Sequence, residues 1–431
     1  MLDFRQAPPL SIPLRFMLTA PLFGIAGAAL LLWAGADALH SRWQPVTFAS
    51  LHCFTAGFMM QAMVGALWQV MPVVGGVVIV RPALVAAFSH VGLTAGAMLL
   101  VLGMLGATFS SPEMVTLGAA LMTASIAIFV AASLPGLVGS GLRAESARLL
   151  ALALVGLGGT AVAGLVLARS LFGGESFGDV AGLIDLHSTW AFAGWSLPLV
   201  AAVALQFVPM FYMTGSYPRL ADAYLAALGL TLLLSLGAVL FAMSWMRLAG
   251  AAIASLGAVG FAGLTLWRFA RRRRPRRDAT SIGWQLAMTL VFGSVALLAL
   301  RALATESESA SALELAFGAL LVLGVFVTLI GAMLMRILPF LASLHLAAGG
   351  GGWRLEAAPG DRAQRAQVWL QAVAAVAIAS AAALPELTRS AAALLLASQL
   401  LLARNVWGYA WALRRAQRKL LPQQKKGESA A

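Results

Sequence analysis

The sequence is poor in charge and in cysteine. Only 10% of its 431 residues are charged, whereas 61% are hydrophobic and the mean hydropathy is +0.89. A soluble domain carries about a quarter charged residues, so this composition excludes a water-soluble globular protein. Cys53 is the single cysteine, which excludes an intramolecular disulfide, a CxxC metal site and c-type haem attachment. The chain is therefore expected to fold in a lipid bilayer as one integral-membrane domain, 1–431.

Apolar runs long enough to cross a bilayer follow one another almost without a break. About 20 apolar residues span a hydrocarbon core of about 30 Å as a helix, whereas the strands of a membrane barrel would alternate over about ten residues. The sequence therefore predicts an all-α membrane protein with about twelve transmembrane helices. The boundary between the seventh and eighth is the least marked and falls at 243–247. The predicted spans are 14–38, 47–79, 83–108, 113–139, 147–168, 183–213, 219–242, 245–269, 282–304, 311–344, 366–385 and 388–413.

Basic residues are distributed unequally between the two sides that this topology defines. With the N-terminus inside, five of the 29 Lys and Arg lie outside and 24 inside, while the 16 acidic residues divide into 7 inside and 9 outside. The positive-inside rule then places both termini in the cytoplasm, as in a bacterial inner-membrane protein. The basic run 271–277 and the segment from Arg414 to Lys426 are expected to contact anionic lipid headgroups, not nucleic acid, because no soluble domain surrounds them. Residues 418–431 are expected to form a cytoplasmic tail. The outer basic residues are Arg42, Arg169, Arg247, Arg301 and Arg389.

Three of the predicted spans, the second, sixth and tenth, share a pattern. Each ends in a polar residue, two apolar residues and a proline, and each has a glycine fifteen residues before that proline. The first and second copies are 137 residues apart and the second and third are 130 apart, for the glycines and for the prolines. This pattern predicts three parallel four-helix repeats, roughly 14–139, 147–269 and 282–413. The repeated residues are Gly57 and Pro72, Gly194 and Pro209, and Gly324 and Pro339.

The polar residue of each copy is Gln69, Gln206 or Arg336. A polar side chain at this depth is costly against lipid, so all three are expected to face inward as a ring near the cytoplasmic end of the bundle. A purely structural role beside a proline kink is the alternative.

The architecture resembles the haem-copper oxidase subunit I superfamily, which has twelve helices in three four-helix arcs and a histidine near the outer end of helix two. The stretch LHCFTAGFMMQAMVGALWQVMPVV is also similar to the NnrS family, haem- and copper-containing membrane proteins linked to nitric-oxide metabolism. The resemblance implies that His52 binds a low-spin haem, and it places His187 where the oxidases bind copper.

The oxidase catalytic motifs are missing. The chain has five histidines in all, where an oxidase needs about six as metal ligands. Predicted helix seven, RLADAYLAALGLTLLLSLGAV, has no histidine pair, and predicted helix ten offers only Glu314 at its outer end. Oxygen reduction and proton pumping are therefore not expected, and the histidine count leaves a copper site open without specifying one.

Histidines within the membrane are the candidate ligands. His52 and His187 each begin a span that runs inward from the outer face, so they are expected at similar depth and could ligate one b-type haem from two sides. Polar packing below the outer interface is the alternative. His90, in the inner half of the third span, is a weaker metal candidate that hydrogen bonding across helices also explains. The acidic residues just upstream of His187 could accept a hydrogen bond from its other ring nitrogen; these are Glu175, Asp179 and Asp185.

Three classes of function remain open. The first is a haem b-binding protein that transfers electrons or handles nitric oxide or another diatomic gas. The second is a secondary transporter, although transporters typically repeat in halves. The third is a cofactor-free assembly partner of a respiratory complex. The acidic outer loop SLFGGESFGDVAGLID is suited to dock a cationic periplasmic redox partner or to cover the outer cleft.

Overall fold

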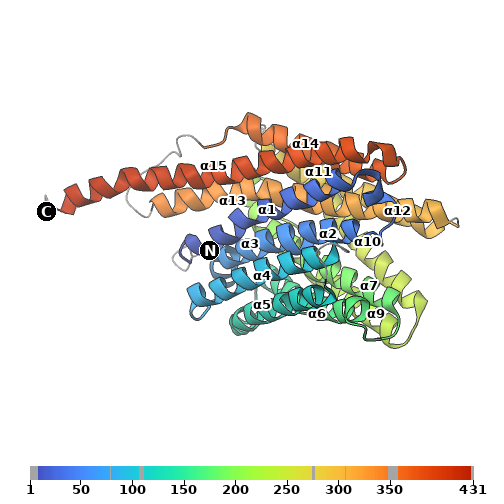
Figure 1. Cartoon of the computed structure of the whole chain (residues 1–431). Helices are drawn as coiled ribbons and strands as arrows, with labels where there is room; N and C mark the ends of the chain where they lie inside the picture. Colours follow the sequence, from blue (N-terminus) through green and yellow to red (C-terminus); the bar gives the residue numbers. More distant parts are fainter. Residues whose placement is uncertain are drawn as a thin grey trace.

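The computed structural model describes residues 8–77, 79–105, 111–273, 277–305, 307–347 and 358–428. The regular structure of this part of the chain is helical, and 11 of its helices are long and apolar enough to cross a membrane. The prediction of an all-α, multi-pass membrane protein is thus confirmed. Figure 1 shows the helices side by side, with the start of α1 (Ser11–Ala34) and the end of α15 (Thr388–Glu428) at the same end of the bundle.

The predicted span 366–385 is the one that is not among these 11. Its residues form α14 (Asp361–Ala381), which packs along α15 (Figure 1). The helix is less apolar than the others because Gln364, Gln367 and Gln371 follow its charged first turn. The break near 243–247 lies slightly earlier than predicted, since α9 (Ala221–Leu240) ends and α10 (Ser244–Ala270) begins on either side of residues 241–243.

Three long helices contain the repeated glycines and prolines, and each is interrupted by a π-helical segment. Between 56% and 78% of the most apolar stretch of each is buried, whereas no other candidate span exceeds 50%. These three composite helices therefore form the centre of the bundle. They are α2 (Pro45–His52), η3 (Cys53–Met59) and α3 (Met60–Gly75); α7 (Val180–Thr189), η4 (Trp190–Ser196) and α8 (Leu197–Tyr212); and α12 (Ser307–Ala319), η5 (Leu320–Val327) and α13 (Thr328–Ala347).

The remaining helices surround these three central ones, and short connections join them. α4 packs against α5, α5 against α6, α9 against α10 and α1 against α15. The helices not yet bounded are α4 (Pro82–Met104), α5 (Pro112–Gly139), α6 (Glu145–Phe172) and α11 (Ala279–Leu303), with the 3₁₀ turns η2 (Gly35–Leu39) and η6 (Pro385–Leu387).

The π-helical segments recur at the spacing of the sequence pattern. They begin at Cys53, Trp190 and Leu320, which are 137 and 130 residues apart, and the repeated glycine is the fifth residue of each. A π-bulge shifts the backbone hydrogen-bond register and is frequent at functional sites. The register shift leaves carbonyls that side chains can reach: Thr328 Oγ1 donates to the Leu323 carbonyl over 3.0 Å.

Glycines let α6 approach η4 closely. A Cβ atom on Gly156 would lie 2.1 Å from the carbonyl oxygen of Gly194, which is backbone and cannot rotate away. In a bilayer, association of helices depends on this kind of close packing because lipid is as apolar as the side chains. The position of α7 and η4 against α6 therefore depends on the absence of a side chain at Gly156.

We expect Gly156→Ala to lower stability by about 1–3 kcal/mol, because its methyl group has to displace backbone. Gly158→Ala on the same helix is the matched control: a Cβ there meets no atom within 4 Å, and helix propensity favours alanine by up to about 1 kcal/mol. The midpoint of thermal unfolding in detergent measures both variants. Equal midpoints would contradict the assigned contact between α6 and η4.

Candidate functional site

His52 and His187 lie near the starts of two of the central helices. His52 is the last residue of α2, directly before η3, and His187 lies on α7 three residues before η4. Each is seven residues from the first residue of its helix. Their separation of 135 residues is two less than the repeat offset, so Thr189, not His187, occupies the position that corresponds to His52. The two imidazoles are nevertheless close enough to interact electrostatically.

Both rings use the same nitrogen for the same purpose. His52 Nδ1 donates to the carbonyl of Phe48 over 2.8 Å, and His187 Nδ1 donates to the carbonyl of Thr160 on α6 over 3.0 Å. A carbonyl can only accept, so in a neutral ring the proton is on Nδ1 and the Nε2 lone pair is free. Within the described residues, neither Nε2 has a hydrogen-bond partner. This is the tautomer and orientation of a histidine that ligates a metal through Nε2.

Glycines on α6 make room for the aromatic side chains of α7 and η4. A Cβ on Gly164 would lie 2.9 Å from Cε1 of His187, and a Cβ on Gly159 would overlap the indole ring of Trp190. The Trp190 indole in turn donates to Ser235 on α9 over 3.1 Å. The His187 ring is therefore fixed by a backbone acceptor and a shaped recess, and not only by its own helix.

The carboxylates expected to support His187 do not do so. Asp185 and Asp179 both face Arg247, at 3.4 and 3.9 Å, and Glu175 pairs with Arg169. The acceptor for His187 is a backbone carbonyl on a helix distant in sequence, for which the sequence gives no signal. The interpretation of the upstream acidic residues as hydrogen-bond acceptors for His187 was therefore wrong.

The other histidines lie apart from this pair. His90 Nε2 contacts Thr19 Oγ1 at 2.9 Å, and its ring meets Phe16 edge-on, which matches hydrogen bonding between α4 and α1. His40 is exposed, and His345 belongs to α13, but its side chain lies outside the part that the structure describes. In the described part of the chain, no three His, Cys, Asp or Glu side chains gather as they would around a metal ion.

Glu314 on α12 connects helices at the end of the bundle opposite the start of α11. Its carboxylate accepts from Arg301 on α11 at 2.7 Å and from Arg42, which precedes α2, at 3.2 Å. The side chain is thus occupied by two guanidinium groups that connect three parts of the chain. These ion pairs give the only acidic side chain on the third central helix within 309–343 a structural role.

Of the three residues of the expected polar ring, Arg336 has the most extensive contacts. Its guanidinium donates to the carbonyl of Phe211 over 2.9 Å, lies 3.5 Å from Asp278 and sits over the Phe211 ring. Gln69 is 6% exposed, and neither polar atom of its side chain has a partner in the described part of the chain. Gln206 is half-buried.

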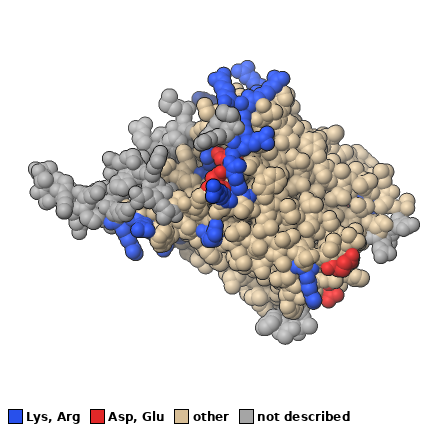
Figure 2. Space-filling model, turned by 90° about the horizontal axis from the view of Figure 1, so that it is seen from above, with Lys and Arg blue, Asp and Glu red and all other residues tan. Residues whose placement is uncertain are grey.

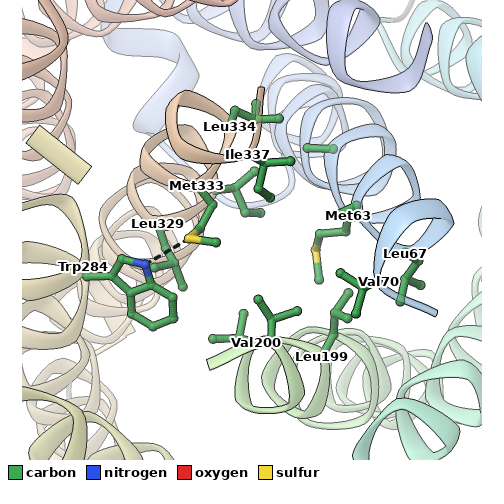
Figure 3. Close-up of a pocket in the computed structure, with 14 residues that line it drawn as sticks. Met63, Leu67, Val70, Leu199, Val200, Trp284, Leu329, Met333, Leu334 and Ile337 are labelled. Carbon is green, nitrogen blue, oxygen red and sulfur yellow. Dashed lines mark hydrogen bonds between the residues drawn. The ribbon is translucent and has the colours of Figure 1, made fainter. Parts of the chain in front are cut away.

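Further along the bundle than the histidine pair, towards Arg336, the three central helices line an apolar cavity of about 60 Å³ (Figure 3). α3 contributes Met63, α8 contributes Leu199 and α13 contributes Met333, whose sulfur accepts from Trp284 Nε1 over 3.0 Å. The lining has almost no polar surface, and a cavity of this kind stays dry.

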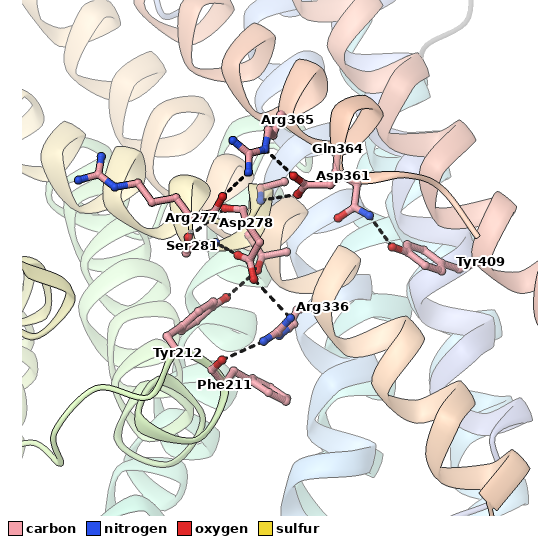
Figure 4. A network of polar contacts seen from close by, with 12 residues as sticks. Phe211, Tyr212, Arg277, Asp278, Ser281, Arg336, Asp361, Gln364, Arg365 and Tyr409 are labelled. Atoms are coloured by element: carbon pink, nitrogen blue, oxygen red, sulfur yellow. Dashed lines mark hydrogen bonds and ion pairs between the residues drawn. The ribbon is translucent and has the colours of Figure 1, made fainter. Parts of the chain in front are cut away.

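A polar pocket of about 610 Å³ lies at the end of the bundle where α11 and α14 begin. Figure 4 shows its network: Asp278 caps α11 through the Ser281 amide and faces Arg336, while Asp361 accepts from the Ala279 amide and from Arg365. Figure 2 shows basic side chains gathered towards this end of the molecule, with acidic ones among them. The remaining lining includes Arg277, Thr280, Gln364 and Tyr409.

We expect Arg336→Leu to lower the free energy of unfolding by about 2 kcal/mol. This value lies between the ~0–1 kcal/mol that an exposed ion pair contributes and the ~3–5 kcal/mol lost when a fully buried pair is broken. The Arg336 and Asp278 side chains are 24% and 27% exposed, so the pair is only partly screened. Arg365→Leu in the same pocket is the control, because Arg365 and Asp361 are 43% and 50% exposed and should contribute less than about 1 kcal/mol. Thermal unfolding in detergent compares the two. A loss of stability in Arg365→Leu as large as that in Arg336→Leu would refute the assignment of the larger contribution to Arg336.

No protein-family model matches the chain, and no curated protein matches it either. The interpretation of the site therefore rests on its own residues.

Proposed function

We propose that this chain is a haem b-binding protein of the bacterial inner membrane, similar to haem-copper oxidase subunit I and closest to the NnrS family. Its function would be electron transfer or the handling of nitric oxide or another diatomic gas. His52 and His187 would be the two axial ligands of one haem in the outer half of the membrane. A b-type haem held by these two histidines would supply reversible one-electron transfer at its iron.

The histidine geometry is the observation that carries this proposal. Two imidazoles come from different central helices, and each donates Nδ1–H to a backbone carbonyl. Both side chains are half-buried, and the hydrogen bond of Nδ1 to a carbonyl leaves Nε2 as the nitrogen available to a ligand. One haem bound by both histidines would use the two Nε2 atoms together.

The remaining central helix argues against an oxidase. Between 309 and 343 it contains no histidine, and its single carboxylate is bound by Arg42 and Arg301. A second haem or a three-histidine copper site would need ligands from this helix. We therefore do not extend the proposal to oxygen reduction or proton pumping.

The proposed three-repeat architecture has support beyond the glycine and proline pattern. Ser50 and His187 are 137 residues apart, and each contacts the preceding outer helix at a glycine, Gly27 and Gly164, which are also 137 apart. Together with the equally spaced π-helical segments, these contacts support a repeat that includes the outer helices as well as the central ones.

The proposed orientation puts both termini and the polar pocket in the cytoplasm. The outer face then carries the loop after α6, where a periplasmic redox partner would dock. Two carboxylates of that loop are already paired, Glu175 with Arg169 and Asp179 with Arg247. Docking there would depend on displacing these exposed pairs, each of which contributes little stability.

For the haem proposal, the test is the reduced optical spectrum of protein purified after expression with ample haem. The wild type is expected to show a low-spin haem b. His52→Ala and His187→Ala should each leave a high-spin or empty site, because Met59 and Met60, the nearest other ligand types on the first helix, lie about two turns further along.

His90→Ala is the matched control, since it removes an intramembrane imidazole with a different partner and should leave the low-spin spectrum unchanged. A low-spin signal that survives both axial-ligand substitutions would refute the assignment. A wild type without haem would favour a transporter or a cofactor-free assembly partner instead.

The topology is tested with reporter fusions after Gly174, in the loop that follows α6, and at the C-terminus. We expect the first on the outer side and the second inside, because the basic residues lie predominantly on the proposed inner side. Reporters on the same side would be incompatible with twelve crossings.

A further inference from the structure

Polar side chains continue from the pocket of Figure 4 into the middle of the bundle, along the contact between α14 and α15. On α14, Gln364 lines the pocket, and Gln367 and Gln371 follow on the same helical face at spacings of three and four residues. On α15, Tyr409 lines the pocket, and Asn405 follows one turn further in. Gln371 lies ten residues from the start of α14, about 15 Å along the helix and thus near the middle of a bilayer.

Gln367, Gln371, Ser398 and Gln399 form one hydrogen-bond network, beside which Asn405 donates to the Ala363 carbonyl at 3.5 Å. Gln371 Oε1 accepts from Ser398 Oγ at 2.9 Å and from Gln399 Nε2 at 2.7 Å, while Gln371 Nε2 donates to the Leu323 carbonyl of η5 at 3.1 Å. Gln367 Nε2 donates to Ser398 over 3.3 Å. These four side chains and that of Asn405 are at most 2% exposed. Among these five side chains, the buried atoms without a partner in the described part of the chain are oxygens: Gln367 Oε1, Gln399 Oε1 and Asn405 Oδ1.

The missing partners must therefore be hydrogen-bond donors. An unpaired buried oxygen costs about 1–3 kcal/mol, so three together would be a large fraction of the stability of a domain. Water is the small donor that fills such polar spaces, and it needs several polar partners, which this network offers. A metal cation would find no carboxylate among these five side chains.

The polar path stops in the middle of the bundle. A Cβ on Gly24 of α1 would lie 2.2 Å from Gln399 Oε1, so α1 closes the path on that side. Beyond Gln371 and Ser398, the next buried residues towards the opposite end are apolar. These are Ala372, Ala374, Ala375 and Ile378 on α14, and Ala391, Ala392 and Leu395 on α15.

We propose that α14 and α15 enclose a water-filled inlet that runs from the polar pocket to the π-helical segment η5 and ends there. Water entering it donates hydrogen bonds to the orphaned amide oxygens of Gln367, Gln399 and Asn405. The inlet does not depend on the presence of haem.

Ser398→Cys tests the inlet in a Cys53→Ala background, which leaves one thiol. Silver ion in chloride-free buffer is the probe, because it is small and water-borne; thiols left free are then labelled with a maleimide after denaturation and counted by mass spectrometry. Ser294→Cys on α11 is the matched control: Ser294 is 1% exposed and nine residues from the outer end of its helix, against 0% and ten for Ser398.

We expect Ser398→Cys to react at least about tenfold faster than Ser294→Cys, since a thiol in dry, apolar surroundings stays protonated and inert. Adding Gln367→Leu, which replaces an inlet amide by an apolar side chain, should slow the reaction towards the control rate. In sealed vesicles the reaction should be fast only when silver is on the side of the polar pocket.

Equal rates for the two single-cysteine variants, with both proteins eluting as folded monodisperse species, would overturn the proposal and mean that the amides pack dry. A rate unchanged by Gln367→Leu, or equal from both sides of the membrane, would overturn it as well. These silver reaction rates are expected to be the same with and without haem. The experiment therefore tests the inlet independently of the haem proposal.

Discussion

The lipid interior offers no hydrogen-bond partner, so every polar group at membrane depth has to find one inside the protein. In this bundle, backbone carbonyls satisfy much of that demand. His52, His187, Gln371 and Arg336 each donate to a main-chain oxygen, and three of those oxygens belong to a different helix. A carbonyl is fixed by its helix and cannot rotate away. Side chains held in this way acquire a defined orientation as well as a partner.

The π-helical segments connect this hydrogen bonding to the architecture. An α-helix uses its carbonyls internally, whereas a π-bulge shifts the register of that hydrogen bonding. Leu323 in η5 accepts from Thr328 on its own helix and from Gln371 on α14. His52 directly precedes η3, and His187 lies three residues before η4. The candidate ligands and the inner end of the polar network thus both lie at bulges of the central helices.

The sequence predicted an all-α, multi-pass membrane protein, because apolar length reports directly on the bilayer. The glycine–proline pattern marked the three helices that are most buried in the structure, although their central place was not predicted. It also brought His52 and His187 together as candidates. It did not predict the acceptors of their Nδ1 protons, since a carbonyl such as that of Thr160 has no residue-specific signal. The π-helical segments were missed too, although the glycine at the fifth position of each marked them. The amides at Gln364, Gln367 and Gln371 had helical spacing that could have identified a polar face.

An apolar cavity lies among the three central helices, further along the bundle than the histidine pair. Met63 follows His52 by eleven residues, which places the cavity lining about 16 Å further along the helix. Apolar side chains therefore occupy the central space below the histidine pair, while the polar network passes beside it between α14 and α15. A low-dielectric layer on one side of a redox centre penalises the entry of ions and water from that side. An electron carrier benefits from this isolation, whereas a transporter would need polar groups along the same axis. An apolar layer in this position would isolate the haem site proposed at the histidine pair.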